Sequence, residues 1–465
     1  LILVIGFYMA WNIGANDVSN AMGTSVGSGA LTLRRAVILA GNLEFCGAYF
    51  VGANVSETME RGLVNPEIFA TQPLILVLGM CGALLGTSFW LQLASYLRWP
   101  VSTTHAIVGA IIGFGIIAGG FHAILWEEVS FIAVSWIVSP VISAIISYSI
   151  FSLLQKKILY AMDPIEATRR AIPFFFFIVF LTFTLSLMTN GLQNLNLQIS
   201  FAGALGIAFL VGGIAAVISY FVVQRIAVPV GYIQPEGRHS PQTVLSLDKA
   251  IKHLQRVRVS SADETHEKIS LILQDVKSLS RKIREETNFG ERASEYHFVE
   301  KVFVYLQIIS ACYVAFAHGA NDVANAIGPV AAVLGILKNG YITEATIVPP
   351  WLLALGGIGI VIGLATWGWR VIETIGKKIT ELTPTRGFCA EFGAATTILV
   401  ASKLGLPIST THCLVGAVLG VGLARGLSAL NLGMLREIVL SWVVTIPASA
   451  GMSILCFYIL KSIFL

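Results

Sequence analysis

The sequence predicts an all-α polytopic membrane protein: two repeats of transmembrane helices, with broken or re-entrant helices, and a soluble helical insert. Three observations predict this fold, namely an apolar composition, a single charged segment, and motifs that recur in both halves. Apolar residues make up 55% of the 465 positions and charged residues only 12%, whereas soluble domains are about 25% charged. The chain is therefore built for a lipid bilayer.

Apolar runs long enough to cross a bilayer, at roughly 20 residues each, recur along the chain. The chain contains about ten to twelve such segments, depending on where the glycine-rich runs are divided. Examples are Ala36–Gly52, Leu74–Leu97, Ile107–Gly120, Phe131–Leu154, Phe201–Val223, Trp351–Trp369 and Ile438–Leu460.

A charged segment at 225–301 separates two membrane regions, 1–224 and 302–465. It holds 13 Lys and Arg and 11 Asp and Glu, which is 24 of the 56 charged residues in the chain. Apolar residues within it recur at steps of three and four, as on one face of a helix: Ile269, Ile272, Val276, Leu279 and Ile283. We interpret it as a solvated helical hairpin between the membrane halves; the alternative is a regulatory or partner-binding role.

Two motifs recur on either side of this insert in the same order. GANDV begins at Gly14 and at Gly319, an offset of 319 − 14 = 305 residues. PVSTTH begins at Pro100 and PISTTH at Pro407, an offset of 407 − 100 = 307 residues. The chain is therefore predicted to contain two copies of one membrane unit, as secondary transporters often do. The offsets themselves leave open whether the copies are inverted or parallel.

The GANDV motifs place a carboxylate among amides in apolar surroundings. Such a carboxylate is costly in lipid unless a partner or a wet cavity faces it, and the nearest Lys or Arg residues, Arg34 and Lys338, come only at the ends of the segments. A cation from outside is therefore expected, and oxygen ligands without Cys or paired His suit Na⁺. Gly14 and Gly23 would let the helix loosen and expose carbonyls. The candidate cation ligands are Asn16, Asp17, Asn20, Asn321, Asp322 and Asn325. The alternative is that each Asp only caps a helix or bonds a neighbouring Asn.

The two serine–threonine motifs have the character of an anion site. Proline favours the first turn of a helix, and the free backbone N–H groups there bind anions without a charged side chain. Two such turns that meet in the membrane would suit a small tetrahedral oxyanion. The candidate donors are Ser102, Thr103, Thr104, Ser409, Thr410 and Thr411.

Four further ionisable residues lie in apolar segments. His105 and His412 follow the serine–threonine motifs, where a histidine commonly holds the turn by bonding a backbone carbonyl; contact with the oxyanion or proton relay is the alternative. Glu44 and Glu391 have no acidic counterpart in the other repeat. Carboxylates at this depth indicate function, so both are candidate coupling acids, with a buried structural role as the alternative.

Together these motifs resemble the inorganic phosphate transporter (PiT) family, and the stretch GANDVSNAMGTSVGSGALTLRRA is similar to its plastid and bacterial permease branch. The resemblance covers both membrane halves and implies symport of phosphate with Na⁺ or H⁺, inverted repeats and a homodimer. It also implies that the insert at 225–301 faces the cytosol. It places the coupling ion at Asn16, Asp17, Asn321 and Asp322, and phosphate at the two serine–threonine motifs. No other cofactor and no nucleic acid is expected.

The expected function is a secondary active phosphate importer, with Na⁺ favoured and H⁺ as the alternative, working by alternating access. With no basic side chain beside the acids, phosphate alone would add repulsion, so cations should arrive with it. Two other functions stay open: a symporter of another oxyanion such as sulfate, and an uncoupled channel or phosphate-sensing receptor. An enzyme is not expected, because the insert offers no nucleophile–base pair or metal-ligand set. A bacterial plasma membrane is the favoured location, and a plastid inner envelope is the alternative.

Overall fold

The computed structural model describes all residues except 62, 98, 100, 191–198, 229–240, 262, 287–291, 343–347, 369–381, 427–429 and 431. In the described part it assigns helices and no strand, apart from one antiparallel bridge between Val64 and Ile124. The all-α fold class is therefore confirmed. Two predicted segments extend beyond the described residues: the charged insert at 225–301, and the apolar run that ends at Trp369.

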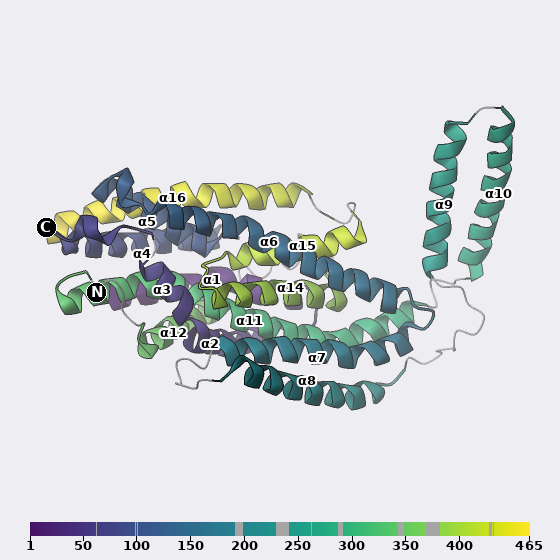
Figure 1. Cartoon of the computed structure of the whole chain (residues 1–465), viewed down its shortest axis with the longest axis horizontal. Coiled ribbons are helices and arrows are strands. Elements are labelled where there is room, and N and C mark those ends of the chain that lie inside the picture. The colour runs from purple at the N-terminus through teal and green to yellow at the C-terminus, as the bar shows by residue number, and fades with distance from the viewer. Residues whose placement is uncertain are drawn as a thin grey trace. The chain divides into compact units, whose positions relative to one another are not determined.

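The helices follow one another along the chain as Figure 1 labels them. The first half contains α1 Ile2–Gly27, α2 Leu33–Val51, α3 Ala53–Arg61, η1 Pro66–Phe69, α4 Pro73–Tyr96, α5 Thr103–Gly119, η2 Phe121–Ala123, α6 Trp126–Leu154, η3 Gln155–Leu159, α7 Pro164–Asn190 and α8 Phe201–Gln224. The rest of the chain contains α9 Pro241–Val259, α10 Asp263–Glu286, α11 Arg292–Asn339, α12 Pro350–Trp367, α14 Pro384–Lys403, α15 Thr410–Arg425 and α16 Leu432–Phe464.

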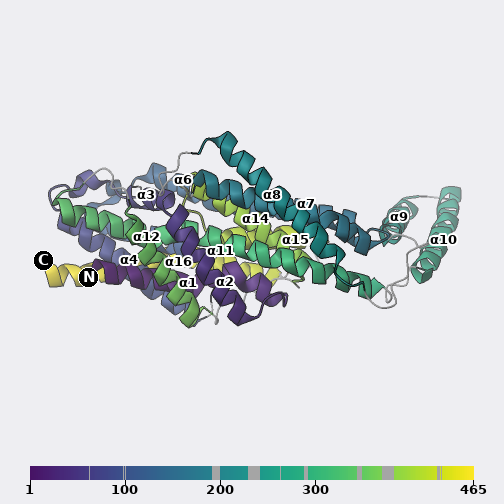
Figure 2. The ribbon, with the colours of Figure 1, turned by 90° about the horizontal axis from the view of Figure 1, so that it is seen from below.

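The described residues form two compact units. The first comprises Leu1–Phe151, Ile178–Gly212 and Val304–Leu465, and the second comprises Ser152–Phe177 and Gly213–Phe303. The described part of the charged insert at 225–301 falls within the second unit, together with neighbouring parts of α6, α7 and α8. Both chain ends, at α1 and α16, lie at the same end of the first unit (Figure 2).

Seven described helices are long and apolar enough to cross a bilayer. The count becomes eight when Leu33–Val51 and Ala53–Met59, which meet at a bend of 68°, are taken as one broken span. Two shorter apolar helices, α5 and α15, accompany them. The chain is therefore an integral multi-pass membrane protein, with seven or eight spans among its described residues where the sequence predicts about ten to twelve.

Two helical hairpins in the first unit contain the serine–threonine turns, at which the chain passes from one helix to the next. Helix α4 packs against α5, and α14 packs against α15. With 17 residues, α5 is about 25 Å long, shorter than the roughly 30 Å of a bilayer core. A serine caps each second helix: Ser102 Oγ accepts from His105 N, and Ser409 Oγ accepts from His412 N, both at 3.2 Å.

Helices α1 and α11 run unbroken through their GANDV motifs, so the expected loosening at Gly14 and Gly23 is wrong. The glycines of the motifs permit close packing instead. A Cβ on Gly14 would lie 1.9 Å from the Ile360 carbonyl oxygen of α12, and a Cβ on Gly319 would lie 2.0 Å from the Glu44 carbonyl oxygen of α2. Small residues allow membrane helices to approach this closely. The helix breaks lie instead at the serine–threonine turns.

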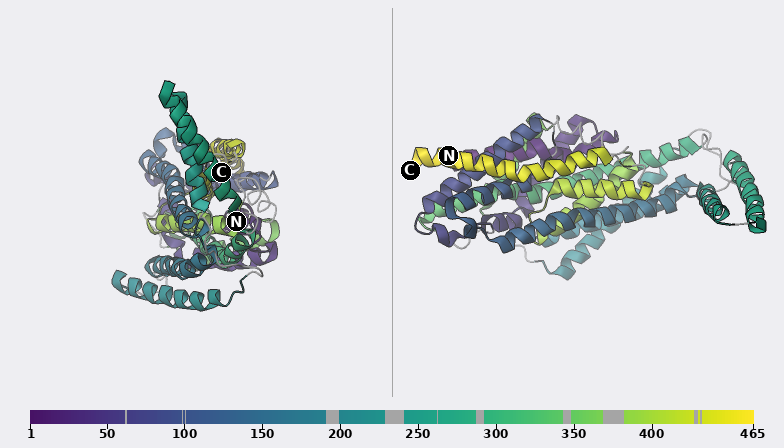
Figure 3. Two further views of the ribbon diagram at one scale, coloured as in Figure 1. Left: turned by 90° about the vertical axis from the view of Figure 1, so that its right-hand side faces the viewer. Right: turned by 90° about the horizontal axis from the view of Figure 1, so that it is seen from above.

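In the second unit, α9 and α10 pack side by side as a helical hairpin (Figure 3). Leu273 and Ile283 of α10 are buried, whereas Ile272 and Leu279 are about half exposed. The buried face of α10 therefore includes Leu273 in place of the expected Ile272, and it retains Ile283 as expected. Ile272 and Leu273 are adjacent apolar residues, so periodicity could not decide which of them faces α9.

Candidate functional site

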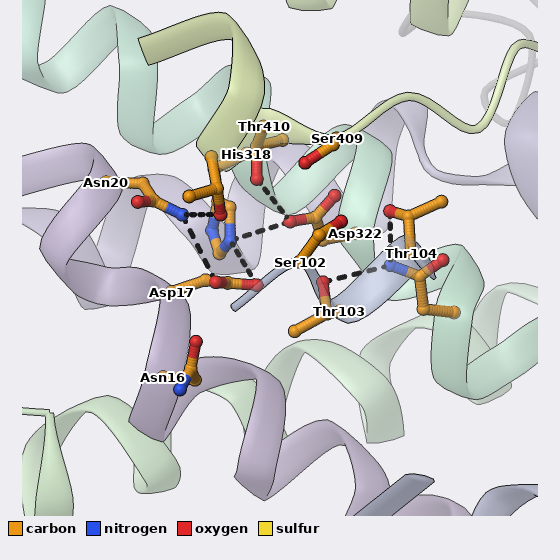
Figure 4. Close-up of polar contacts among 12 residues, drawn as sticks. Asn16, Asp17, Asn20, Ser102, Thr103, Thr104, His318, Asp322, Ser409 and Thr410 are labelled. Atoms are coloured by element: carbon orange, nitrogen blue, oxygen red, sulfur yellow. Dashed lines mark hydrogen bonds and ion pairs between the residues drawn. The ribbon is translucent and has the colours of Figure 1, made fainter. Parts of the chain in front are cut away.

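The two GANDV motifs place their acids in one buried cluster in the first unit. Asp17 lies on α1 and Asp322 on α11, and both side chains are almost fully buried. Asn20, one turn after Asp17, donates from Nδ2 to Asp17 Oδ1 at 3.1 Å. Figure 4 shows that these residues and the serine–threonine turns point toward one another. The tertiary structure therefore brings together motifs that lie about 300 residues apart in the sequence.

The two serine–threonine turns bond to each other. Thr104 Oγ1 donates to the Ile408 carbonyl at 2.9 Å, and Thr411 Oγ1 donates to the Val101 carbonyl at 3.4 Å. The arrangement is reciprocal, because each turn donates one hydroxyl hydrogen bond and accepts one at a backbone carbonyl. The N-terminal ends of α5 and α15 therefore meet, and the positive ends of their dipoles favour an anion between them.

Hydrogen bonds also join the acidic motifs to the turns. Asn20 Nδ2 donates to Thr411 Oγ1 at 2.8 Å, and Asn325 Nδ2 donates to Thr104 Oγ1 at 3.2 Å. Thr410 Oγ1 donates to Asp322 Oδ2 at 2.8 Å. The two asparagines therefore each bind the turn of the other half, and Asp322 binds the turn of its own half. Carboxylates, amides and hydroxyls form a continuous polar network (Figure 4).

Sequence reasoning missed His318, which lies at the centre of the acidic cluster. Its Nε2 is 2.9 Å from Asp322 Oδ2 and 3.9 Å from Asp17 Oδ2, and its Nδ1 is 3.1 Å from Glu44 Oε1. The expectation that no basic side chain lies beside the acids is therefore wrong, because an imidazole can carry a positive charge. The repeat hid this residue, since Ile13 takes the corresponding position before the first GANDV. A histidine one turn before an intramembrane Asp was the available signal.

Several oxygen atoms in the cluster are buried and receive no hydrogen bond from the described residues. They include Asp17 Oδ2, Asn20 Oδ1, Asp322 Oδ1 and Asn325 Oδ1. A buried acceptor without a partner costs about 1–3 kcal/mol, and a hard cation is the partner that carboxylate and amide oxygens prefer. One ligand atom each from Asp17, His318 and Asp322 lies within 4.8 Å of the others. These residues therefore have the chemistry of a cation site.

Asn16 and Asn321 are placed differently from the other amides. Asn16 Nδ2 contacts Ser95 Oγ at 3.0 Å, and Asn321 Nδ2 donates to Ser402 Oγ at 3.1 Å. Asn321 Nδ2 also donates to the Leu406 carbonyl at 3.1 Å. These contacts fix each GANDV helix to the end of α4 or α14, just before the turn. With the Asn16 amide turned so that its oxygen accepts from Ser95 Oγ, its nitrogen donates to Asp17 Oδ1 at 3.2 Å, so Asn16 also reaches the cluster (Figure 4).

The two candidate coupling acids lie in different surroundings. Glu44 belongs to the central cluster through His318. Glu391, on α14, accepts hydrogen bonds from Ser25 Oγ at 2.7 Å and from the hydroxyls of Thr24 and Ser310. Glu391 is fully buried, and its donors come from α1 and α11. A carboxylate with this many donors is a second polar site, separate from the acidic cluster.

His105 and His412 pack against each other and against tryptophans. Their ring centroids are 4.4 Å apart, with Trp136 at 3.9 Å from His105 and Trp442 at 3.5 Å from His412. His412 Nδ1 lies 3.4 Å from the Trp136 carbonyl, which agrees with a turn-holding role. The His105 ring lies close to the Trp442 backbone, so the turn-holding role stays a prediction for His105.

The fold and the site define a multi-pass membrane protein with a buried, two-sided polar centre. The profile of the family described as "Phosphate transporter family" matches residues 13–453, and the chain belongs to this family. The resemblance noted in the motifs is thereby confirmed.

Full-length relatives agree with this assignment. A protein of Chlamydia pneumoniae that its name assigns as a phosphate permease is 45% identical over all of this chain and 98% of its own length. The "Inorganic phosphate transporter 2-1, chloroplastic" of Arabidopsis thaliana is 42% identical over 99% of this chain and 72% of its own length. A solved structure called "The sodium-dependent phosphate transporter" is 38% identical, with a TM-score of 0.77, and the match covers 100% of this chain and 98% of that one. Bacterial and plastid relatives are both present.

Proposed function

We propose that this chain imports inorganic phosphate by symport with cations, through alternating access around the cluster of Asp17, Asp322 and the two serine–threonine turns. The observation that carries the proposal is that both halves contribute an acid and a hydroxyl-bearing helix start to one buried network. Membership of the phosphate transporter family supports phosphate as the substrate. Two half-sites that meet at the interface of repeats are the usual arrangement for alternating access.

The charges in the cluster explain why cations must accompany the anion. Asp17, Asp322 and Glu44 can carry three negative charges, and His318 can carry one positive charge. Phosphate adds one or two negative charges to this surplus. Two like charges 4 Å apart repel by about 4 kcal/mol at an effective dielectric constant of 20. Cations that bind the unpartnered carboxylate and amide oxygens would remove this repulsion, so phosphate and cations should bind together.

Sodium is the favoured coupling ion. The unpartnered atoms in the cluster are mostly oxygens, which suit Na⁺, and the similar solved structure is named as sodium-dependent. The proton is the alternative, because Glu44 and His318 are ionisable groups in contact, and either could bind a proton. In this proposal His318 neutralises part of the acidic charge, which lowers the number of cations that each phosphate requires.

Glu391 is our candidate for a second cation or proton position. Its Oε1 and Oε2 accept from hydroxyls of α1 and α11, the same helices that carry Asp17 and Asp322. A movement of α14 relative to these helices would exchange the hydroxyl donors for a cation or a proton. Glu391 could therefore couple ion binding to the position of the α14–α15 hairpin.

Phosphate uptake into proteoliposomes tests the proposal. We expect uphill accumulation of radiolabelled phosphate that depends on a Na⁺ gradient and is lost with choline, measured at two pH values so that H⁺ coupling would show itself. Uptake indifferent to both gradients would reject symport. Equal competition by unlabelled sulfate would favour the broader oxyanion symporter, and downhill flux without accumulation would favour a channel. The homodimer stays a prediction that sedimentation in detergent can test.

A further inference from the structure

A cavity in the first unit is lined by residues outside the acidic cluster. Its volume is about 200 Å³, which has room for an oxyanion with several waters at about 30 Å³ each. Helices α7, α11 and α14 and the first residue of α8 line it. The lining residues are Thr182, Leu185, Ser186, Thr189, Phe201, Tyr313, Thr396, Leu399, Val400 and Lys403.

Lys403, the last residue of α14, supplies the positive charge of this cavity. Its neighbour Ser402 accepts a hydrogen bond from Asn321 of the GANDV motif at 3.1 Å. Lys403 therefore lies at the level of the central site along α14. Its ammonium group makes no ion pair or hydrogen bond with any described residue. The side chain is exposed at the C-terminal end of α14, where an arriving anion can reach it, and the central cluster makes no use of this charge.

The cavity surface is mostly apolar, and hydroxyl groups supply its polar part beside Lys403. Thr182, Ser186 and Thr189 follow one another at steps of three and four on α7, so they lie on one face of this helix. Tyr313 of α11 lies with its hydroxyl beside those of Thr182 and Thr396. Thr182 donates to the Ile178 carbonyl of its own helix, a bond that rotation of the hydroxyl can exchange for one to a ligand.

We propose that this cavity is an outer site for a phosphate group, which the Lys403 ammonium holds before the anion moves to the central cluster. The inference rests on the proposed function and adds a loading position to it. Lysine binds phosphate as a point charge, whereas the central cluster carries a surplus of acids that repels an anion until cations have entered. Lys403 would therefore collect phosphate close to a site that cannot yet accept it. A phospholipid headgroup offers the same chemistry as free phosphate, so the test must distinguish these two sources.

Transport kinetics of the full chain give the first readout. We expect Lys403→Gln to raise the half-saturating phosphate concentration about tenfold with little change in maximal rate, because electrostatic focusing acts on arrival of the anion. Lys403→Arg should keep most of the affinity. Lys338→Gln, which removes an exposed lysine from the last turn of α11, is the matched control and should resemble the wild type. The assay is run in zwitterionic vesicles and again with anionic lipid added.

A labelling experiment in Na⁺-free nanodiscs gives a second readout that does not depend on transport. Ser186→Cys is modified with a water-soluble methanethiosulfonate reagent, and the wild type, with its six free cysteines, sets the background. Inorganic phosphate should slow modification of Ser186→Cys, and this protection should vanish when Lys403→Gln is added.

The outcomes distinguish failure of the outer phosphate site from failure of the proposed transport function. No protection by phosphate, or a kinetic effect of Lys403→Gln that appears only with anionic lipid, would overturn the outer phosphate site, and the second result would assign the cavity to a lipid headgroup. Failure of the wild type to accumulate phosphate would reject the proposed function instead. Protection in the labelling experiment would still show phosphate in the cavity in that case.

Discussion

His318 Nε2 lies 2.9 Å from Asp322 Oδ2, one helical turn away on α11. The same ring reaches Glu44 of α2 through Nδ1 at 3.1 Å. One imidazole therefore links two helices and two acids in the buried centre, and the second half of the chain supplies it without a counterpart in the first half. The two repeats are thus chemically unequal at the site, although their motifs are nearly identical.

We expect His318→Gln to lower phosphate uptake at least about tenfold, because removal of one partner from a buried charged pair costs roughly 3–5 kcal/mol. The amide is similar in length but cannot carry a positive charge. His122→Gln, at an exposed position on η2, serves as the control. Initial uptake rates in proteoliposomes provide the measurement, and normal rates for His318→Gln would show that the imidazole has no part in transport.

Asp17→Asn and Asp322→Asn should each lose most ion-driven uptake, about tenfold or more, while the protein still folds. The amide keeps the size of the side chain but removes a charge-assisted contact worth about 1.5–3 kcal/mol, so a loss of this size is expected. Na⁺-dependent uptake and thermal unfolding with and without Na⁺ measure the effect. Asp275→Asn on the exposed face of α10 is the control. Wild-type uptake by either variant would remove the proposed cation role of that residue.

Thr104→Val and Thr411→Val should weaken phosphate binding more than cation binding. Valine keeps the shape but loses the hydroxyls that join the two turns, each bond being worth about 0.5–1.5 kcal/mol. The half-saturating phosphate concentration should therefore rise about three- to tenfold. Thr445→Val removes a buried hydroxyl that bonds only its own helix, at the Ser441 carbonyl, and should have little effect. An unchanged half-saturation in both turn variants would argue against the hydroxyl site.

Glu391→Gln should raise the half-saturating Na⁺ concentration with a smaller effect on phosphate. Its amide group would face the Ser310 or Ser25 hydroxyl where an oxygen now accepts a bond, and the loss of charge would weaken any cation held there. We also expect a loss of about 1–3 kcal/mol in the free energy of unfolding. Uptake over a series of Na⁺ concentrations tests the coupling role, and an identical Na⁺ dependence would leave Glu391 with a structural role alone.

Gly14→Ala should destabilise the protein by about 1–3 kcal/mol or more. The new Cβ would lie 1.9 Å from the Ile360 carbonyl oxygen, so α1 and α12 would have to separate. Gly213→Ala in α8 meets no atom within 4 Å and should be neutral or slightly stabilising. Thermal unfolding of the purified proteins compares the two, and equal melting temperatures would mean that the α1–α12 contact tolerates expansion.

The motifs predicted the location of the polar centre better than its contents. Asp17 and Asp322 could be chosen because a carboxylate in an apolar segment is costly, and the recurrence of each motif made chance a poor explanation. His318 escaped because the repeat gave no second copy, and because Glu44 comes near it only through packing of α2 against α11. Periodicity likewise failed for α10, where two adjacent apolar residues could each face α9.

The sequence by itself determined that this chain crosses a membrane several times, that two motifs recur in the same order in both halves, and that it resembles phosphate transporters. Those conclusions depend on composition and on residue order, which need no coordinates. Only the tertiary structure decided which amides point to the cluster and which hold the hairpins, that an imidazole lies between the acids, and that Lys403 lines a separate cavity. Contacts between residues hundreds of positions apart depend on how helices pack, and helix packing is set by side-chain shape across the whole unit and not by any local pattern.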